Sequence, residues 1–306
     1  MVVIEVNGIS KSFGDTQAVN NVSFEVTQGR IFGLLGPNGA GKTTAIRMIN
    51  HILIPNSGTI TINGKQAGPE TQRMIGYMPE ERGLYKKMKV GEQLIYLARL
   101  KGLERREAKE ATEFWLKRFD ALDWRGKNVG ELSKGMSQKI QFIATIAHDP
   151  DIYIFDEPFS GLDPINSETL KEIVLELRDN GKTILFSTHR MEQVEQMCDE
   201  ICLFNNGRSV LDGDLRAIKK SFGKNTVNIE FQGDPSFLDT LQDVRINNRS
   251  TNFAEIRVLD GQNIQDILKV AMNHAEIYKF ERIEPSLQEI FISTVGEDNL
   301  KNQGVS

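Results

Sequence analysis

Few cysteines and no long apolar run set the first limits on this 306-residue sequence. The two cysteines, Cys198 and Cys202, stand close together, and the second lies in the apolar run ICLF. The chain has no apolar start that could serve as a signal peptide. We therefore expect reduced core thiols in a cytosolic protein rather than a disulfide or a metal site. No stretch of about eighteen uncharged apolar residues occurs, so no segment is expected to span a bilayer. A role at a membrane would need a partner.

The chain also lacks an excess of positive charge. Its 37 lysine and arginine residues are outnumbered by 42 aspartate and glutamate residues, and the formal net charge is −5. This balance gives no general electrostatic reason to bind nucleic acid. Because 306 residues exceed one ordinary domain, a main domain with a smaller appended one is the default expectation.

The spacing of apolar residues divides the chain. Alternation in VVIEVNGI, VSFEV and TITI predicts half-buried antiparallel strands, with turns expected at Asn7-Gly8 and Asn63-Gly64. From about residue 84 to residue 148 the spacing is helical and the composition is charged. The later runs DIYIFDEP and KTILFSTH are short, apolar and end in polar residues. Such runs are typical of buried parallel strands, whose carboxyl ends carry the chemistry.

A glycine-rich loop follows the apolar segment IFGLL and precedes a helical pattern. In GPNGAGKTT the spacing matches G-x-x-x-x-G-K-[ST]. Glycines let backbone N–H groups converge on phosphate oxygens, and the helix start adds its positive end. Lys42 would reach the β- and γ-phosphates, and the Thr43 hydroxyl would bind Mg²⁺; the alternative is a glycine-rich turn with a surface lysine. The predicted phosphate-binding residues are Gly36, Asn38, Gly39, Ala40, Gly41, Lys42, Thr43 and Thr44.

Two carboxylates, Asp156 and Glu157, follow four apolar residues in IYIFDEP. Because burying both without compensation would be costly, we expect a cation nearby. Asp156 fits a partner of Mg²⁺, and Glu157 fits the base that polarises the attacking water. The alternative is an acidic strand end that caps the following helix. His189 ends the strand ILFSTH, where it is predicted to contact the γ-phosphate, whereas the other three histidines lack such a context.

Seven short segments occur in one order: KSFG, GPNGAGKTT, IGYMPE, LSKGM, IFDEP, SGLD and STH. In this order and spacing they resemble an ABC-type ATPase cassette. The resemblance implies an α/β fold with a P-loop, RecA-like core, an antiparallel β subdomain and a helical subdomain. It also implies a dimer that holds two ATP molecules between its subunits, with Phe13 stacked on adenine and Asp163 in contact with the opposing subunit.

The segment LSKGM begins at Leu132 and precedes a helical pattern, so Ser133 to Met136 is expected at or just before a helix start. A P-loop wraps phosphates from one side, and no arginine in these motifs is placed to act as a finger. The resemblance implies that LSKGM closes the site across the dimer interface, with Ser133, Gly135 and Met136 binding the nucleotide. An ordinary serine-capped surface helix is the alternative.

The sequence departs from the commonest family pattern in two segments. Lys134 and Met136 replace the usual Gly and Gln of the signature. Glu80 stands where most members carry a Gln that binds Mg²⁺ and senses the membrane subunit. A carboxylate still binds Mg²⁺ but adds negative charge near the γ-phosphate, so the predicted metal ligands are Thr43, Glu80 and Asp156. PEERGLY and LSKGM together resemble a branch of bacterial exporters that includes sodium-extruding and antibiotic or peptide efflux ATPases.

The cassette is expected to occupy residues 1–224, with its helical subdomain at about 84–148. Beyond it, TVNIEF, DVRI, NFAEIRVL and YKFERI predict strands, whereas IQDILKVAM and SLQEIFISTV predict helices. The expected order, β-α-β-β-α-β, is that of a ferredoxin-like α+β accessory domain over 225–295. The last helix should open with a capping box at Ser286 and Glu289. RNA binding is disfavoured because no aromatic RNP signature occurs, and a regulatory or dimer-supporting role is expected. Residues 296–306 are expected to be a flexible tail.

These features predict an ATP-binding and ATP-hydrolysing subunit of an ABC transporter, with ATP and Mg²⁺ as cofactors. It would power export through a separate polytopic membrane permease and pair with a second copy or a related subunit. The expected location is the cytoplasm, at the inner face of the cell membrane through the permease. The alternative is a soluble ABC-type clamp of translation or DNA repair, although neither a second cassette nor a long coiled-coil insertion appears. Glu157 disfavours a regulator without turnover.

Overall fold

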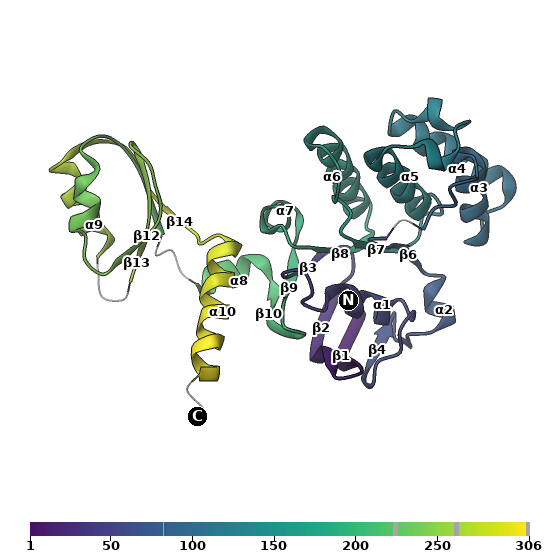
Figure 1. The fold of residues 1–306 in the computed structure, drawn as a ribbon, viewed down its shortest axis with the longest axis horizontal. Coiled ribbons are helices and arrows are strands. Elements are labelled where there is room, and N and C mark those ends of the chain that lie inside the picture. Colours follow the sequence, from purple (N-terminus) through teal and green to yellow (C-terminus); the bar gives the residue numbers. More distant parts are fainter. Residues whose placement is uncertain (82, 223–225, 260–262, 304–306) are drawn as a thin grey trace. The chain divides into compact units, whose positions relative to one another are not determined.

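The computed structural model describes residues 1–81, 83–222, 226–259 and 263–303 (Figure 1). The chain divides into two compact units, Met1–Asp214 and Leu215–Ser306. This division falls before residue 224, where the sequence analysis placed the end of the cassette. In the described part of the chain, no helix is long and apolar enough to cross a membrane.

An antiparallel sheet in the order β2-β1-β4-β5 opens the first unit. Its strands are β1 (Val2–Phe13), β2 (Thr16–Thr27), β4 (Ser57–Ile62) and β5 (Lys65–Gln66). The three predicted strands are confirmed, and so is the Asn63-Gly64 turn, which connects β4 to β5 with positive φ at both residues. The turn predicted at Asn7-Gly8 is wrong, because both residues lie inside β1. The register of β1 against β2 shifts there, and Gly8 has a φ of 58°. A glycine bulge needs the same left-handed backbone as a tight turn, so the dipeptide alone does not separate them.

The second sheet of this unit has the strand order β10-β9-β3-β8-β7-β6. Its strands are β3 (Ile31–Leu35), β6 (Ile75–Met78), β7 (Ile152–Asp156), β8 (Thr183–Thr188), β9 (Glu200–Asn205) and β10 (Arg208–Asp214). All neighbours are parallel except the antiparallel pair β10-β9. Every residue of β3, β7 and β8 is buried, which confirms the parallel strands predicted from the two late apolar runs. Because β3, β8 and β7 are neighbours, the segments that follow them meet at one edge of the sheet.

The helices of the first unit occupy the connections between strands. They are α1 (Lys42–Ile49), α2 (Pro69–Gln72), α3 (Val90–Leu100), α4 (Arg105–Arg118), α5 (Lys134–Ile146), α6 (Pro164–Asp179) and α7 (Met191–Met197), with 3₁₀ helices η1 (Leu122–Trp124) and η2 (Val129–Glu131). Helices α3, α4 and α5 pack together within the region where a helical subdomain was expected (Figure 1). Ser133 is the N-cap of α5, so the predicted helix start is confirmed.

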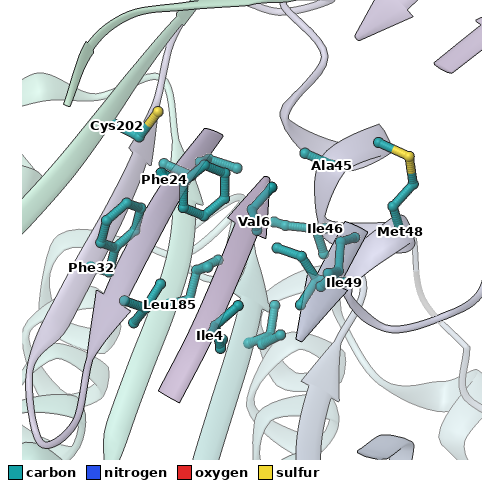
Figure 2. Close-up of a cluster of buried hydrophobic side chains, with 14 of the residues drawn as sticks. Ile4, Val6, Phe24, Phe32, Ala45, Ile46, Met48, Ile49, Leu185 and Cys202 are labelled. Carbon is teal, nitrogen blue, oxygen red and sulfur yellow. The ribbon is translucent and has the colours of Figure 1, made fainter. Parts of the chain in front are cut away.

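A shared core joins the two sheets of the first unit through α1 (Figure 2). The rings of Phe24 on β2 and Phe32 on β3 stack with their centroids 5.2 Å apart. Figure 2 shows α1 side chains beside those of β1 in this core. The helix contributes Ala45, Ile46, Met48 and Ile49, and β1 contributes Ile4 and Val6. Burial of this apolar face holds α1, and with it the loop before it, at the carboxyl end of β3.

The second unit contains an antiparallel sheet in the order β12-β13-β11-β14. Its elements are α8 (Leu215–Ser221), β11 (Thr226–Gly233), η3 (Pro235–Thr240), β12 (Val244–Arg249), β13 (Phe253–Val258), α9 (Ile264–Met272), β14 (Ala275–Ile283) and α10 (Leu287–Gln303). Side chains of α9 share a buried core with the sheet. The four predicted strands and both named helices are confirmed.

Two details of the second unit differ from the expected β-α-β-β-α-β order. The connection between β11 and β12 holds only the 3₁₀ helix η3 (Pro235–Thr240), and the backbone is extended again at its C-cap, Leu241. A helix also follows the last strand. The predicted capping box opens it, since the Ser286 N–H donates to Glu289 and the Glu289 N–H donates to the Ser286 hydroxyl. This helix, α10, extends to Gln303 and so into the segment expected to be a tail; residues 304–306 lie outside the described residues.

Candidate active site

The glycine-rich loop lies between β3 and α1, and its glycines are required by the backbone. Gly36 has a φ of 146°, and a Cβ there would lie 2.2 Å from the Phe204 carbonyl oxygen. Gly41 has a φ of 104°, and a Cβ there would lie 2.4 Å from the Ala18 carbonyl oxygen. Gly41 is the N-cap of α1, and neither a side-chain cap nor an acidic residue occupies the first turn of the helix. The helix start therefore presents free backbone N–H groups to an anion.

Lys42 lies over this loop and is buried. Its Nζ donates to the carbonyl oxygens of Gly36, at 2.7 Å, and Pro37, at 3.0 Å. Burial lowers the pKa of Lys42, an effect that the nearby carboxylates Glu157, Asp156 and Glu80 oppose. The ammonium is thus held beside the loop by two neutral carbonyl acceptors. A negatively charged phosphate oxygen is a stronger acceptor and can replace them.

Asp156 ends β7 and is fully buried. Its Oδ1 accepts hydrogen bonds from Ser187 Oγ, at 2.5 Å, and Thr43 Oγ1, at 3.2 Å. Its Oδ2 is buried and has no hydrogen-bond partner among the described residues. Burial raises the pKa of Asp156, because the carboxylate is desolvated. An unpaired carboxylate oxygen beside a threonine hydroxyl is the donor set that a hard cation such as Mg²⁺ prefers, so these residues fit the predicted metal.

Glu80 lies just after β6, and its side chain lines a cavity together with the phosphate loop. Burial raises its pKa, and the neighbouring Asp156 and Glu157 raise it further. In the described part of the chain, no three His, Cys, Asp or Glu side chains are placed to form a metal cage. A metal ion here would therefore be held by few protein oxygens and would need the phosphates of a nucleotide, as is usual for Mg²⁺.

Glu157 is held in an unusual backbone conformation at the end of β7. Its φ is 50°, and its N–H donates to the carbonyl and hydroxyl oxygens of Ser187 on β8. Nδ1 of His189 lies 2.9 Å from Glu157 Oε1. Because a carboxylate only accepts hydrogen bonds, Nδ1 carries the hydrogen and Nε2 is left for another partner. His189, which is predicted from the sequence to contact the γ-phosphate, lies against Glu157 in the structure.

A cavity of about 380 Å³ brings most of these residues together. It is lined by Ala18, Asn38, Gly39, Ala40, Gly41, Lys42, Thr43, Thr44, Glu80 and Glu157. Ala18 was not predicted; it lies on β2, and nothing in its sequence context marks it. The phosphate loop, Glu80 and Glu157 thus meet at one cavity, although they come from segments far apart in the chain.

Other predicted residues lie outside the cavity lining. Phe13 is half exposed at the end of β1, and its ring centroid is 5.7 Å from Lys11 Nζ. Ser133 Oγ accepts from the Met136 N–H at the start of α5. Asp163 caps α6 and accepts from the Asn166 N–H, and hydrogen bonds from Asn166 lower the pKa of Asp163. Within one chain, the structure does not bring these residues or Gly135 to the phosphate loop.

The site and the fold define the class of the protein. A phosphate-binding loop after β3, an Asp-Glu pair at the end of β7 and a helical subdomain beside the parallel sheet form a P-loop ATPase cassette. Residues 19–160 match the family ABC transporter, and residues 213–295 match the C-terminal domain of ATP-binding proteins that are DrrA1-3-like. The chain belongs to the family of ABC transporter ATP-binding proteins, which bind and hydrolyse ATP to power transport.

The similarity extends over nearly the whole chain. The uncharacterized ABC transporter ATP-binding protein YhaQ of Bacillus subtilis (strain 168) is 45% identical, and the match covers 96% of this chain and 99% of the relative. The Nod factor export ATP-binding protein I of Rhizobium sp. (strain N33) is 34% identical, with 97% and 98% covered. A solved structure of an ATP-binding subunit of an ABC transporter is 35% identical, with a TM-score of 0.68, and covers 72% of this chain and 93% of that chain.

Proposed function

We propose that this chain hydrolyses Mg²⁺-bound ATP in the cavity described above and drives an exporter. The observation that carries the proposal is the convergence of Lys42, Asp156 and Glu157 on one phosphate loop, where an Asp156 oxygen beside the Thr43 hydroxyl has no partner among the described residues. Three carboxylates and one lysine leave the pocket with unbalanced negative charge. A divalent cation is the counter-charge that would let ATP enter.

The proposed roles follow from the geometry of each side chain. Bound Mg²⁺ would neutralise phosphate charge, held by Asp156, Thr43 and Glu80. Lys42 would exchange its two carbonyl acceptors for phosphate oxygens. Glu157 would accept a proton from the attacking water through the carboxylate oxygen that His189 does not occupy, because Oε1 already accepts from Nδ1. Nε2 of His189 would then face the γ-phosphate.

A P-loop wraps phosphates from one side, which supports a second copy or a related subunit as the partner that completes the site. The LSKGM segment lies at the start of α5, outside the cavity of its own chain, so we propose that it serves the cavity of the opposite subunit. Exporter relatives such as the Nod factor export protein support transport outward rather than the clamp alternative. The proposed location is therefore the cytoplasmic face of the membrane, where the chain meets its permease.

An apolar cavity offers a docking place for that permease. It measures about 300 Å³ and is lined by Tyr77, Pro79, Gly83, Leu84, Leu97, Leu100, Lys101, Gln141, Ala144, Thr145 and His148. Leu100 is one of these lining residues and is 65% exposed. An apolar hollow with an exposed apolar side chain is typical of protein–protein contacts. We propose that an apolar segment of the permease binds here, next to the Glu80 segment.

The exchange of Glu157 for Gln tests the proposed chemistry. Glu157→Gln keeps shape and hydrogen bonding but removes the basic carboxylate, so kcat should fall by about 10²–10⁴ while ATP still binds. Glu192→Gln, an exposed position on α7, is the matched control and should keep normal turnover. Steady-state hydrolysis and nucleotide binding would be measured on the purified full chain. Near-normal hydrolysis by Glu157→Gln would remove Glu157 from this role.

A further inference from the structure

Helix α5 carries two buried glutamines on one face. Gln138 is 3% exposed and Gln141 is 4% exposed, and a spacing of three places them side by side on the helix. Burying a primary amide is unfavourable unless it makes hydrogen bonds. Both side chains make such bonds, and both use them on backbone carbonyls that lie next to acidic residues of the active site.

Gln141 bonds to both neighbours of Glu80. Its Nε2 donates to the Pro79 carbonyl oxygen at 2.7 Å and to the Glu81 carbonyl oxygen at 3.3 Å. Its Oε1 is buried and has no partner among the described residues. The amide therefore acts through its two N–H groups alone, and the opposite orientation would place its oxygen against two carbonyl oxygens. The backbone on either side of Glu80 is tied to α5.

Gln138 bonds to the residue after Glu157. Its Nε2 donates to the Pro158 carbonyl oxygen at 3.0 Å, in a buried setting. Glu157 itself has a φ of 50°, a strained conformation for a residue with a side chain. Such strain persists only where the surroundings hold it. Here the Ser187 acceptors hold the Glu157 N–H from one side, and Gln138 holds the next carbonyl from the other.

We propose that Gln138 and Gln141 are positioning residues that hold the Glu157 and Glu80 carboxylates from one helix. This inference rests on the proposed function, because it assumes that Glu80 binds Mg²⁺ and that Glu157 activates water. The helix that holds both carboxylates is also the helix that starts at Ser133. Any displacement of the LSKGM segment along α5 therefore reaches both acidic residues through two side chains, without passing through the phosphate loop.

The test uses three single exchanges of glutamine for methionine in the full chain. Methionine has a similar length and keeps the volume but cannot donate. Gln141→Met removes the bonds beside Glu80, and Gln138→Met removes the bond beside Glu157. Gln93→Met is the matched control, because Gln93 on α3 is also fully buried, yet neither atom of its amide has a partner in the described structure.

The two positions should affect different measurements. Gln141→Met should raise by about tenfold the Mg²⁺ concentration at which ATP gives half of its maximal increase in Tm, the loss expected for buried hydrogen bonds. This increase is measured in the Glu157→Gln background, where ATP should be consumed about 10²–10⁴ times more slowly. Gln138→Met should lower kcat by about tenfold with little change in KM for ATP or in the Mg²⁺ requirement. Gln93→Met should change neither quantity.

Glu80→Ala separates the inference from the function on which it rests. If Glu80→Ala raises the Mg²⁺ requirement and Gln141→Met does not, the role of Gln141 is refuted while that of Glu80 stands. If Glu80→Ala leaves the requirement unchanged, the metal role of Glu80 fails and the role of Gln141 fails with it. In the supporting result, Gln141→Met adds no further shift to Glu80→Ala, because both act on the same group.

A variant that does not fold is replaced rather than discarded. Gln141→Asn and Gln138→Asn keep the amide but are one methylene shorter, so they cannot span the same gap and should reproduce the two separate defects. Methionine and asparagine variants that match Gln93→Met in Mg²⁺ requirement, kcat and KM would overturn the proposal. A lower Tm in the absence of nucleotide, with the Mg²⁺ requirement, kcat and KM unchanged, would show a purely structural role. That result would also overturn the proposal.

Discussion

Two glycines of the phosphate loop offer a direct test of how the loop is built. Gly36 and Gly39 both have positive φ, at 146° and 80°, so an alanine at either position is strained. They differ in the space available. A Cβ on Gly36 would lie 2.2 Å from the buried Phe204 carbonyl, whereas a Cβ on Gly39 meets nothing within 4 Å. Gly36→Ala should therefore be destabilising through both backbone strain and steric overlap, whereas Gly39→Ala should be destabilising through backbone strain alone.

The expected sizes follow from these two contributions. The positive φ alone costs about 1–2 kcal/mol for alanine. The overlap at Gly36 forces the backbone of β9 to move and adds about 1–3 kcal/mol, as overpacking does elsewhere. Gly36→Ala should thus lose about 2–5 kcal/mol and Gly39→Ala about 1–2 kcal/mol. For a domain of about 150–250 residues, each kcal/mol corresponds to about 2–4 °C in Tm.

The assay is thermal unfolding of the purified chain without nucleotide, followed by far-UV circular dichroism. Gly36→Ala should unfold at a clearly lower temperature than Gly39→Ala, and both should unfold below the unmodified protein. Equal losses in the two variants would show that the Phe204 carbonyl yields freely, so the close approach of β9 to the loop would not explain Gly36. A stable Gly36→Ala variant would contradict the geometry of the loop itself.

Two further predictions concern partners. Leu100→Glu should abolish co-purification with a polytopic membrane protein while leaving ATP binding intact. Leu122→Glu is the control, because Leu122 is 47% exposed but does not line the apolar cavity. Equal loss of co-purification in both variants would reject this docking place. In tagged heterodimers, Lys42→Ala in one copy and Ser133→Arg in the other should restore ATP trapping that neither homodimer shows. A signature that acts across the interface leaves one site intact, whereas heterodimers that trap no more ATP than the homodimers would reject the shared site.

Much of the fold could be predicted because local pattern and tertiary structure agree. The two largely apolar runs that end in polar residues form the buried strands β7 and β8, and the alternating runs form the antiparallel sheet. Errors occurred where one local geometry serves two purposes. The backbone of Gly8 suits both a turn and a bulge, and only pairing with β2 selects the bulge. In the second unit, the expected order placed a helix between β11 and β12, where the structure has only the 3₁₀ helix η3.

The sequence indicates which residues form the site more readily than which of them contact one another. The spacing of the P-loop motif and the strand-end positions of Asp156 and Glu157 carry their chemistry in the sequence. That His189 contacts Glu157 depends on β7 and β8 being neighbours, which no motif states. Ala18 lines the cavity because β2 passes beside Gly41, and its residue type gives no sign of this. The sequence does not distinguish Gln141 from other polar residues on a helix. Its role depends on the packing of α5 against the segment at Pro79.

The starts of α1 and α5 differ in a way that fits the proposed sharing of one site between two chains. The start of α1 has no side-chain cap, so its N–H groups are available to phosphates, and the cavity opens beside them. The start of α5 is capped by Ser133, whose oxygen already accepts from Met136, and its LSKGM residues do not line the cavity. To bind a nucleotide in another subunit, the Ser133 hydroxyl must donate its hydrogen to a phosphate oxygen while its oxygen still accepts from the Met136 N–H. A hydroxyl can do both, because it has one donor hydrogen and two acceptor lone pairs. The same helix would then sense the γ-phosphate at one end and hold Glu80 and Glu157 through its middle.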